Sequence, residues 1–197
     1  QDAVDTYKLN LDLSISNEDL TLLDQSKIPK ADLLLGGFPC QDFSSSGSKK
    51  GFKGSKGMLY KIMINYLNRH KPKIVIGENV SHLGKLAKGS YLKTILKDIE
   101  NEGYKTQVWD IFCPDYGLPQ SRRRLFIVGV REDLPRFPEK PKVTHNANYL
   151  TIDQALKDLE NISNEVIPNQ SQYFLSSKAS SGGGQGDHTN KYGDIAY

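Results

Sequence analysis

Short apolar runs of strand length alternate along the chain with longer segments of helical periodicity, and this alternation limits the folds open to it. The runs are leucine-rich or β-branched and are closed by glycines or polar residues, which is typical of buried parallel strands. The strand-like runs are residues 30–37, 73–80, 106–112 and 125–130, and the helical segments are residues 58–70 and 91–102. The alternation predicts an α/β fold with an open, mostly parallel sheet and right-handed crossovers.

Polar residues follow the strand-like runs, at the edge where open α/β sheets bind their ligands. Residues 39–41 (Pro-Cys-Gln) follow the first run, and residues 78–80 (Glu-Asn-Val) close the second. Residues 115–124, between the last two runs, could reach the same edge. Because the carboxyl ends of parallel strands lie side by side, we expect these groups to converge on one crevice.

The composition is that of a globular protein and excludes several other classes. Hydrophobic residues make up 37% and charged residues 25% of the 197 residues, and no apolar run approaches the roughly 20 residues that cross a bilayer. The N-terminal sequence QDAVDTYKLN has no basic segment before an apolar stretch, so we expect no membrane association and a cytoplasmic location. Two cysteines are too few for a disulfide scaffold.

Positive charge is concentrated in two short segments that we expect in loops. The net charge of +3 is too small by itself to indicate a nucleic-acid partner. Residues 48–57 and residues 122–124 nevertheless carry runs of lysine or arginine. Such runs are either solvated surface or contacts for a polyanion, and arginine forks suit phosphates and base edges.

Cys40 and Glu78 are the two residues whose position suits chemistry. Cys40 follows two glycines, Phe38 and Pro39, so the backbone can turn sharply after the strand and present a reactive thiol. The alternative is a packed, inert thiol, which is our interpretation of Cys113. Glu78 ends an apolar strand, where an acid must stay near solvent, be paired or hold a proton. A protonated Glu78 would suit a general acid, and a capping or salt-bridging carboxylate is the alternative.

Three motifs resemble those of the cytosine carbon-5 DNA methyltransferase family. Residues 38–44 (FPCQDFS) resemble its Pro-Cys-Gln-x-Phe-Ser motif, and residues 77–80 (GENV) are similar to its Glu-Asn-Val motif. Residues 120–124 (QSRRR) resemble its Gln-x-Arg-x-Arg motif, and residues 115–119 (DYGLP) before them are likewise similar. The motifs keep the family's order and spacing and fall on the expected strand ends, and the resemblance covers residues 2–130.

The resemblance implies a Rossmann-like fold that transfers a methyl group from S-adenosylmethionine, without a metal ion, to carbon 5 of a cytosine flipped out of double-stranded DNA. Cys40 would attack carbon 6 of the base, and Glu78 would hydrogen-bond ring nitrogen 3 and the exocyclic amine. Arg124 would contact the base and its neighbours, and Arg122 would help to hold Glu78 or the backbone. Asn79 would orient the cysteine loop.

Other motif residues are implied as supporting or cofactor-binding residues. Gln41, or side chains of a recognition domain, would fill the gap left by the flipped base, and residues 44–56 would close over that base. Pro39 and Leu59 would line the cofactor pocket, and Asp19 resembles an aspartate that contacts the adenine, with a surface turn acid as the alternative. The supporting set is Pro39, Gln41, Ser44, Asn79 and Gln120.

Two parts of the family pattern have no counterpart in the sequence. These are the glycine-rich Asp-x-Phe-x-Gly-x-Gly segment with the acid after it, which hold the methionine and ribose of the cofactor, and the arginine-rich helix after the recognition domain. We therefore expect a sheet that is incomplete at its N-terminal side and a partial catalytic core in residues 1–134. Residues 135–197 would form a linker, with a short helix at residues 152–159, and the start of a target-recognition region. A truncated chain and one subunit of a split enzyme, with a complementary polypeptide as partner, are both open.

Two other functions also stay open. A transfer-RNA cytosine methyltransferase of the same architecture would share these motifs, and methyl transfer to DNA compared with RNA would separate the two. A catalytically silent DNA-binding fragment would keep some of the motifs, although intact Cys40, Glu78 and Arg124 argue against a decayed enzyme.

Overall fold

The structure, a computed structural model, describes residues 2–11, 15–39 and 59–157 of the chain. The chain divides into two compact units. The first unit comprises Gln1–Trp109 and Leu125–Pro138, and the second comprises Asp110–Arg124 and Glu139–Tyr197. The expected boundary at residue 134, between a catalytic core and a recognition region, stays a prediction.

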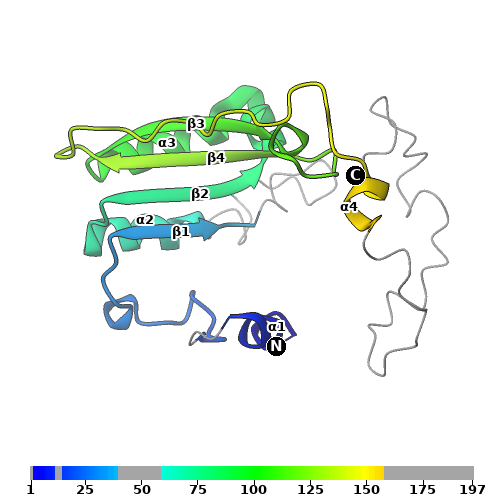
Figure 1. The fold of residues 1–197 in the computed structure, drawn as a ribbon. Helices are drawn as coiled ribbons and strands as arrows, with labels where there is room; N and C mark the ends of the chain where they lie inside the picture. The colour runs from blue at the N-terminus through cyan, green and yellow to red at the C-terminus, as the bar shows by residue number, and fades with distance from the viewer. Residues whose placement is uncertain (1, 12–14, 40–58, 158–197) are drawn as a thin grey trace. The chain divides into compact units, whose positions relative to one another are not determined.

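A four-stranded sheet carries the fold, with the strands in the order β1, β2, β4, β3 (Figure 1). β1 and β2 are parallel, in a register that pairs Leu33 with Ile74 and Gly37 with Glu78. β4 points the opposite way in Figure 1, so the sheet is mixed rather than fully parallel. The strands are β1 (Leu33–Gly37), β2 (Ile74–Val80), β3 (Tyr104–Phe112) and β4 (Arg123–Arg131). All four expected strands form, and the predicted α/β fold is confirmed.

Two helices follow strands where the periodicity predicts them, and local residues end both. α2 (Tyr60–His70) stops at Lys71, which has a left-handed φ of 49° and precedes Pro72. α3 (Ser90–Asn101) is followed by Gly103, whose φ of 88° is one that glycine adopts readily. Within the described residues, the shorter helices are α1 (Asp2–Asn10), α4 (Ile152–Leu156) and the 3-10 helices Gln25–Lys27, Ser81–Gly84, Leu86–Gly89 and Cys113–Tyr116.

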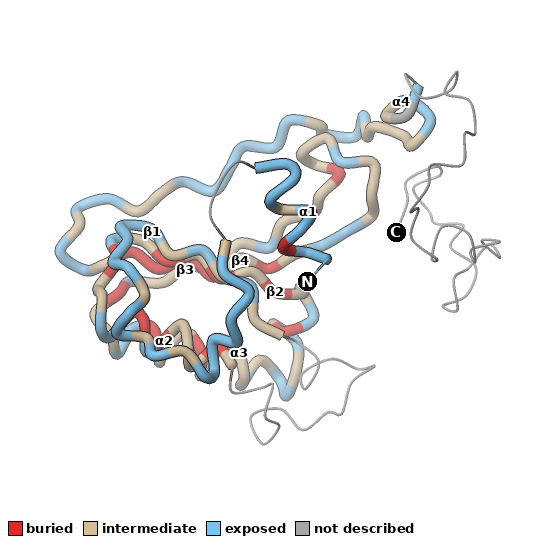
Figure 2. Tube along the Cα trace, turned by 90° about the horizontal axis from the view of Figure 1, so that it is seen from below, coloured by how far each residue is buried: buried red, intermediate tan, exposed pale blue. Residues whose placement is uncertain are grey.

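The core lies between the sheet and the helices α2 and α3, where the buried segments gather in Figure 2. Gly129 of β4 allows a close approach there, because a Cβ on it would lie 2.7 Å from Val75 and 3.2 Å from Ile99. Both of those side chains are fully buried. A larger residue at position 129 would push β2 or α3 away, so this glycine fixes the spacing of the layers.

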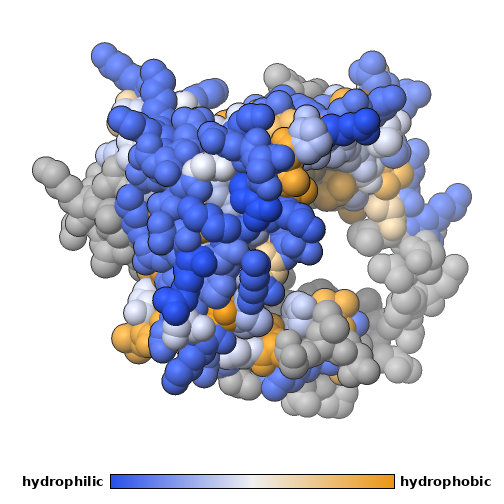
Figure 3. Space-filling model, turned by 90° about the vertical axis from the view of Figure 1, so that its left-hand side faces the viewer, coloured by the Kyte–Doolittle hydropathy of each residue, from blue (hydrophilic) through white to orange (hydrophobic). Residues whose placement is uncertain are grey.

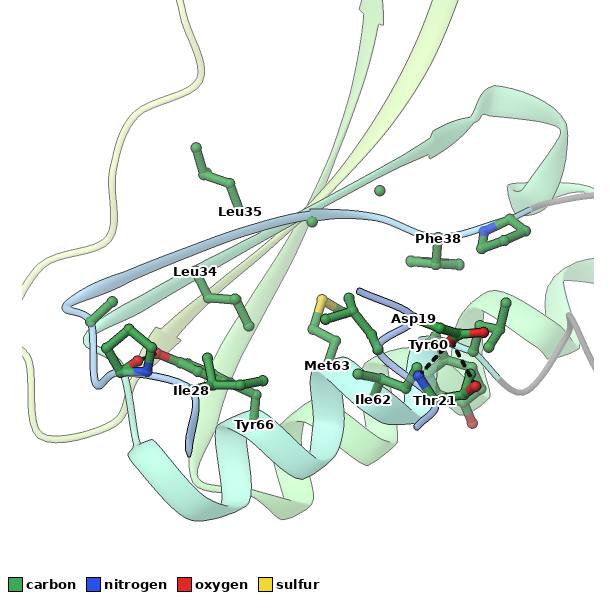
Figure 4. Close-up of a pocket in the computed structure, with 17 residues that line it drawn as sticks. Asp19, Thr21, Ile28, Leu34, Leu35, Phe38, Tyr60, Ile62, Met63 and Tyr66 are labelled. Carbon is green, nitrogen blue, oxygen red and sulfur yellow. Dashed lines mark hydrogen bonds between the residues drawn. The ribbon is translucent and has the colours of Figure 1, made fainter. Parts of the chain in front are cut away.

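β1 is an edge strand with one covered face and one open face. Leu34 packs against the core, and Gly36 lies opposite Met63 of α2. Leu33 and Leu35 lie on the other face and are 46% and 66% exposed. Figure 4 shows Leu35 pointing away from α2. The edge strand that leads to the cysteine motif therefore has one exposed face.

Two expectations for the second unit need correction. Arg123 and Arg124 are the first residues of β4 rather than loop residues, so the pairing of that strand fixes their backbone. Cys113 begins the 3-10 helix Cys113–Tyr116 and is half-buried rather than packed in a core. The lysine-rich run of residues 48–57 lies outside the described residues.

The helices within the described ranges are all too short or too polar to span a membrane. On the face drawn in Figure 3, hydrophilic residues predominate, and hydrophobic residues form small separate patches.

Candidate active site

The ends of β1 and β2 bring Gly37 and Glu78 side by side. The two residues are partners in the parallel register, and Oε2 of Glu78 lies 3.6 Å from the position that a Cβ on Gly37 would take. Glu78 is half-buried at the strand end, so the residue is not fully withdrawn from solvent. This is one of the ways in which an acid is tolerated at the end of an apolar strand.

Asn79 links the same two strand ends through a buried amide. Asn79 is 2% exposed, and its Nδ2 donates a hydrogen bond to the carbonyl oxygen of Phe38 at 3.0 Å. Its Oδ1 accepts one from the backbone N–H of Val80 at 2.9 Å. With a partner on each side, the orientation of the amide is fixed. Asn79 thereby holds the backbone just before the cysteine loop, which is compatible with its expected role.

Tyr60 and Asp98 support this arrangement from the helix layer. The ring of Tyr60 lies 6.1 Å from that of Phe38, and its hydroxyl donates to Oδ2 of Asp98 at 2.6 Å. Lys61 forms an ion pair with the same oxygen at 2.7 Å. Burial acts to raise the pKa of Asp98, but the hydrogen bonds from Lys61 and Tyr60 outweigh it and lower the pKa below its ordinary value. Asp98 is therefore ionised at neutral pH and ties the start of α2 to α3.

The motifs gave no sign of Tyr60 or Asp98 as residues near the site. The one available signal is the spacing of Tyr60, Ile64 and Leu67, which places three buried side chains on one face of α2. That spacing indicates a core face and does not indicate which residue meets Phe38.

A cavity of about 640 Å³ opens beside the end of β1, between that strand, the start of α2 and residues 19–31 (Figure 4). Its lining is mostly apolar. The three residues expected to bind the cofactor, Asp19, Pro39 and Leu59, all line it, and so does Phe38. The structure therefore places these three residues around one space.

Asp19 is held in a turn at the rim of this cavity. Its Oδ1 accepts hydrogen bonds from the hydroxyl of Thr21 at 2.7 Å and from the backbone N–H of Thr21 at 2.8 Å (dashed in Figure 4). These two bonds lower the pKa of Asp19, so the side chain is ionised at neutral pH. The bonds are those of a turn acid, and the same carboxylate lines the cavity, so the two interpretations of Asp19 are compatible.

The arginine motif belongs to the second unit and is held there through its backbone. The carbonyl oxygen of Arg122 accepts a hydrogen bond from the N–H of Cys113 at 2.8 Å, and the N–H of Arg122 donates to the carbonyl of Gln120 at 2.7 Å. The side chain of Arg124 donates from Nη1 to the carbonyl of Arg123 at 2.8 Å. Arg122 is exposed, with its guanidinium on the surface of this unit.

Three of the expected site residues, Cys40, Gln41 and Ser44, lie outside the described residues. What the structure brings together in the first unit is the backbone leading to Cys40, the acid Glu78, the amide of Asn79 and the apolar cavity. This is a strand-end crevice of the kind expected from the alternation of strands and helices.

The comparison with known families decides what this crevice belongs to. A family model of C-5 cytosine-specific DNA methylases matches residues 1–192, well past residue 130, where the resemblance of the motifs ends. The chain belongs to the C-5 cytosine-specific DNA methylase family. Among characterised DNA methylases, it is 36% identical over 175 residues to the Type II methyltransferase M.NgoFVII of Neisseria gonorrhoeae, covering 84% of this chain and 47% of that one.

Other DNA methylases give a consistent result. The chain is 32% identical over 180 residues to the Type II methyltransferase M.BsuRI of Bacillus subtilis, covering 91% of this chain and 41% of that one. A solved structure of a DNA modification methyltransferase encoded within an E. coli prophage aligns with a TM-score of 0.61 at 23% identity, over 79% of this chain and 45% of that one. This likeness supports the Rossmann-like fold of the DNA methylases. The chain spans less than half the length of each of these three proteins.

Proposed function

We propose that this member of the family transfers a methyl group from S-adenosylmethionine to carbon 5 of a cytosine flipped out of double-stranded DNA. The observation that carries the proposal is the meeting of two strand ends immediately before Cys40. Glu78 lies beside Gly37, and Asn79 holds the carbonyl of Phe38. An acid thus adjoins the backbone that leads to the proposed nucleophile, and the reaction needs both groups at one base.

The cavity beside β1 fits the adenosine part of S-adenosylmethionine. Its volume of about 640 Å³ lies within the range of about 300 to 1,000 Å³ that is usual for small-molecule sites. Phe38, Pro39 and Leu59 supply apolar walls for an adenine ring, and the ionised Asp19 supplies an acceptor for an amine or hydroxyl. When bound, S-adenosylmethionine supplies the methyl group.

Cys40 is the proposed nucleophile. Its thiolate forms a bond from Sγ to carbon 6 of the cytosine, and the electrons of the 5,6 double bond move to carbon 5, which is otherwise a poor nucleophile. After methylation, carbon 5 gives up its proton to solvent, the electrons of that C–H bond re-form the 5,6 double bond, and Sγ leaves carbon 6 as the thiolate, so the ring regains its aromaticity.

Glu78 is the proposed acid. It holds a proton at ring nitrogen 3 and accepts a hydrogen bond from the exocyclic amine, so that negative charge moving into the ring during the attack is neutralised. Its half-buried position at the strand end leaves its carboxyl group within reach of a base that enters from solvent.

The arginine motif and the lysine-rich run are the proposed contacts to DNA. Arg124 contacts the base and its neighbours, Arg122 holds Glu78 or the backbone, and Gln120, Gln41 and Ser44 support them. Lysines within residues 48–57 meet the phosphates, where each neutralised charge adds affinity that falls with salt. Flipping the base costs a few kcal/mol, which these contacts offset.

A complementary polypeptide is part of the proposal. The glycine-rich cofactor segment of the family has no counterpart in these residues, and the chain spans 47% of M.NgoFVII. That segment and a recognition domain, carried by a further stretch of the same protein or by a complementary polypeptide, would complete the site. The cytoplasmic location stays a prediction.

Trapping the covalent adduct tests the proposal. DNA containing 5-fluorocytosine is mixed with this chain, a polypeptide that supplies the absent family segments, and S-adenosylmethionine. Because fluorine does not leave carbon 5 as a cation, release of Cys40 stalls, and a shifted band is expected on a denaturing gel. Cys40→Ser should abolish the band.

The second cysteine provides the matched control. Cys113→Ser should leave the adduct at the wild-type level, because Cys113 lies in the second unit and has no proposed role. An adduct that survives Cys40→Ser and disappears in Cys113→Ser would refute the assignment. Methyl transfer to RNA in place of DNA would refute DNA as the substrate but would leave the proposed covalent mechanism standing.

A further inference from the structure

The loop before the arginine motif is held by a segment that the sequence presents as part of a linker. The carbonyl oxygen of Asp115 accepts hydrogen bonds from the backbone N–H groups of Thr144 and His145, both at 3.0 Å. The carboxylate of Asp115 accepts a third from the hydroxyl of Tyr149, also at 3.0 Å. We name residues 141–149 the brace. Residues 113–122, the loop that it holds, are called the arginine loop.

The brace also covers the turn in the arginine loop. Gly117 has a φ of 82°, and a Cβ on it would lie 2.7 Å from Cε1 of His145, so the imidazole sits directly on the glycine. Nδ1 of His145 lies 2.9 Å from the hydroxyl of Thr144, which fixes the ring. The hydroxyl of Tyr116 donates to the carbonyl of Pro141 at 3.0 Å. The brace therefore contacts three consecutive residues of the loop, Asp115, Tyr116 and Gly117.

These contacts continue from the loop to the arginines themselves. The N–H of Cys113 donates to the carbonyl of Arg122 at 2.8 Å. The ring of Tyr149 meets that of Phe112 edge-on, with 5.8 Å between centroids and an angle of 85°. The guanidinium of Arg123 lies 4.5 Å from the centroid of the same Phe112 ring. Tyr149 is thus linked to the segment before β4 by two interactions, its hydrogen bond to Asp115 and its ring contact with Phe112.

We propose that the brace is a positioning element for the arginine motif and that Tyr149 is its main positioning residue. The inference rests on the proposed function, in which the arginines contact DNA. An arginine on an exposed strand end loses rotamer and backbone freedom when it binds a phosphate or a base. A backbone that is already fixed reduces this loss, so the brace raises DNA affinity without touching DNA.

The first measurement is binding of a fluorescein-labelled duplex by the full chain. Tyr149→Leu should weaken binding about 5- to 10-fold, the effect usual for one lost hydrogen bond. In a chain whose residues 122–124 are all alanine, the same substitution should change nothing further, because the brace acts through the arginines. An undiminished effect of Tyr149→Leu in that background, or none in the wild type, would overturn the proposal.

The second measurement is amide hydrogen exchange, which does not depend on DNA. Tyr149→Leu should speed exchange at Cys113 and Leu118 about 10-fold, through easier local opening, and Tyr149→Phe should restore part of the protection by keeping the ring contact. The matched control is Tyr104→Phe, which removes a buried hydroxyl bonded to the carbonyl of Pro72 at 2.7 Å in the first unit and should leave the arginine loop unchanged.

The two measurements separate the inference from the proposed function. Unchanged exchange in Tyr149→Leu would refute the brace. Faster exchange, together with DNA affinity that does not respond to alanines at residues 122–124, would refute the DNA role of the arginines and with it the positioning role of the brace.

Discussion

Asn79 donates a 3.0 Å hydrogen bond from its buried amide to the carbonyl oxygen of Phe38 and so joins the end of β2 to the end of β1. Pro39 and Cys40 follow Phe38 directly, and Glu78 precedes Asn79. One amide therefore controls the spacing between the strand that carries the proposed acid and the backbone that leads to the proposed nucleophile.

Removal of this amide should affect both stability and chemistry. Asn79→Ala leaves the part-buried carbonyl of Phe38 without this hydrogen bond, so the free energy of unfolding should fall by about 1 to 3 kcal/mol. Urea denaturation of the full chain measures the change. In the complemented enzyme, formation of the 5-fluorocytosine adduct should also slow.

Asn68→Ala is the matched control for Asn79. Asn68 donates to Glu102 at 2.8 Å on the surface, so its loss should change the unfolding free energy by less than about 0.5 kcal/mol. Equal effects of the two substitutions would show that the Asn79 bond is no more important than a surface contact.

The proposed role of Glu78 makes a prediction about turnover. Glu78→Gln keeps the shape of the side chain but removes the acidic proton, so methyl transfer in the complemented enzyme should fall roughly 100-fold or more. DNA binding should change far less, because contacts to phosphates carry most of the affinity. Single-turnover rates and duplex titrations give the two numbers, and parallel losses in both would indicate a structural Glu78.

The cavity makes a prediction about cofactor binding. Residues 1–197 by themselves should bind S-adenosylmethionine at least about 100-fold more weakly than the complemented protein, because several hydrogen bonds to charged groups, each contributing about 1.5 to 3 kcal/mol, come from the absent segment. In the complemented protein, Asp19→Ala should weaken the binding of S-adenosylmethionine relative to the protein with Asp19 intact. Isothermal titration measures both, and micromolar binding by residues 1–197 alone would contradict the first.

The bond between Tyr60 and Asp98 makes a prediction about acid stability. Burial acts to raise the pKa of Asp98, but its hydrogen bonds from Lys61 and Tyr60 lower the pKa below the ordinary value of 3.8. A carboxyl with a lowered folded-state pKa stabilises the fold fully above the unfolded value, and this contribution is lost as the pH falls through the folded value. The urea midpoint should therefore drop on acidification below about pH 4 more steeply in the wild type than in Asp98→Asn.

A second ion pair offers a control for the acid titration. Arg131 and Asp133 are also bonded, at 2.6 Å, and the bond lowers the pKa of Asp133, which is on the surface. Asp133→Asn should reduce the fall of the urea midpoint at acid pH less than Asp98→Asn does, because surface ion pairs are screened by solvent. The opposite order would show that the bond across α2 and α3 does not govern acid stability.

Sequence alone was enough for the existence of the four strands, for the helices α2 and α3, and for the family. The β-branched run of residues 73–80 and the glycine at Gly103 act through local conformational preference, so the strands and the end of α3 form where the pattern predicts them. The order and spacing of the motifs around Cys40, Glu78 and Arg124 likewise predicted the family that the comparisons show. These features depend on residues that are close together in the chain or on the order of motifs along it, so the sequence alone contains them.

Tertiary structure decided which distant residues act together. Tyr60 and Asp98 are 38 positions apart, and Tyr149 and Asp115 are 34 apart. Nothing in the spacing of these side chains marks them as partners, because helical or strand periodicity identifies a buried face and not what packs against it. The entry of β4 between β2 and β3, which turns Arg123 from a loop residue into a strand residue, was decided in the same way. Such contacts follow from packing in three dimensions, where strand order and close approach select the partners.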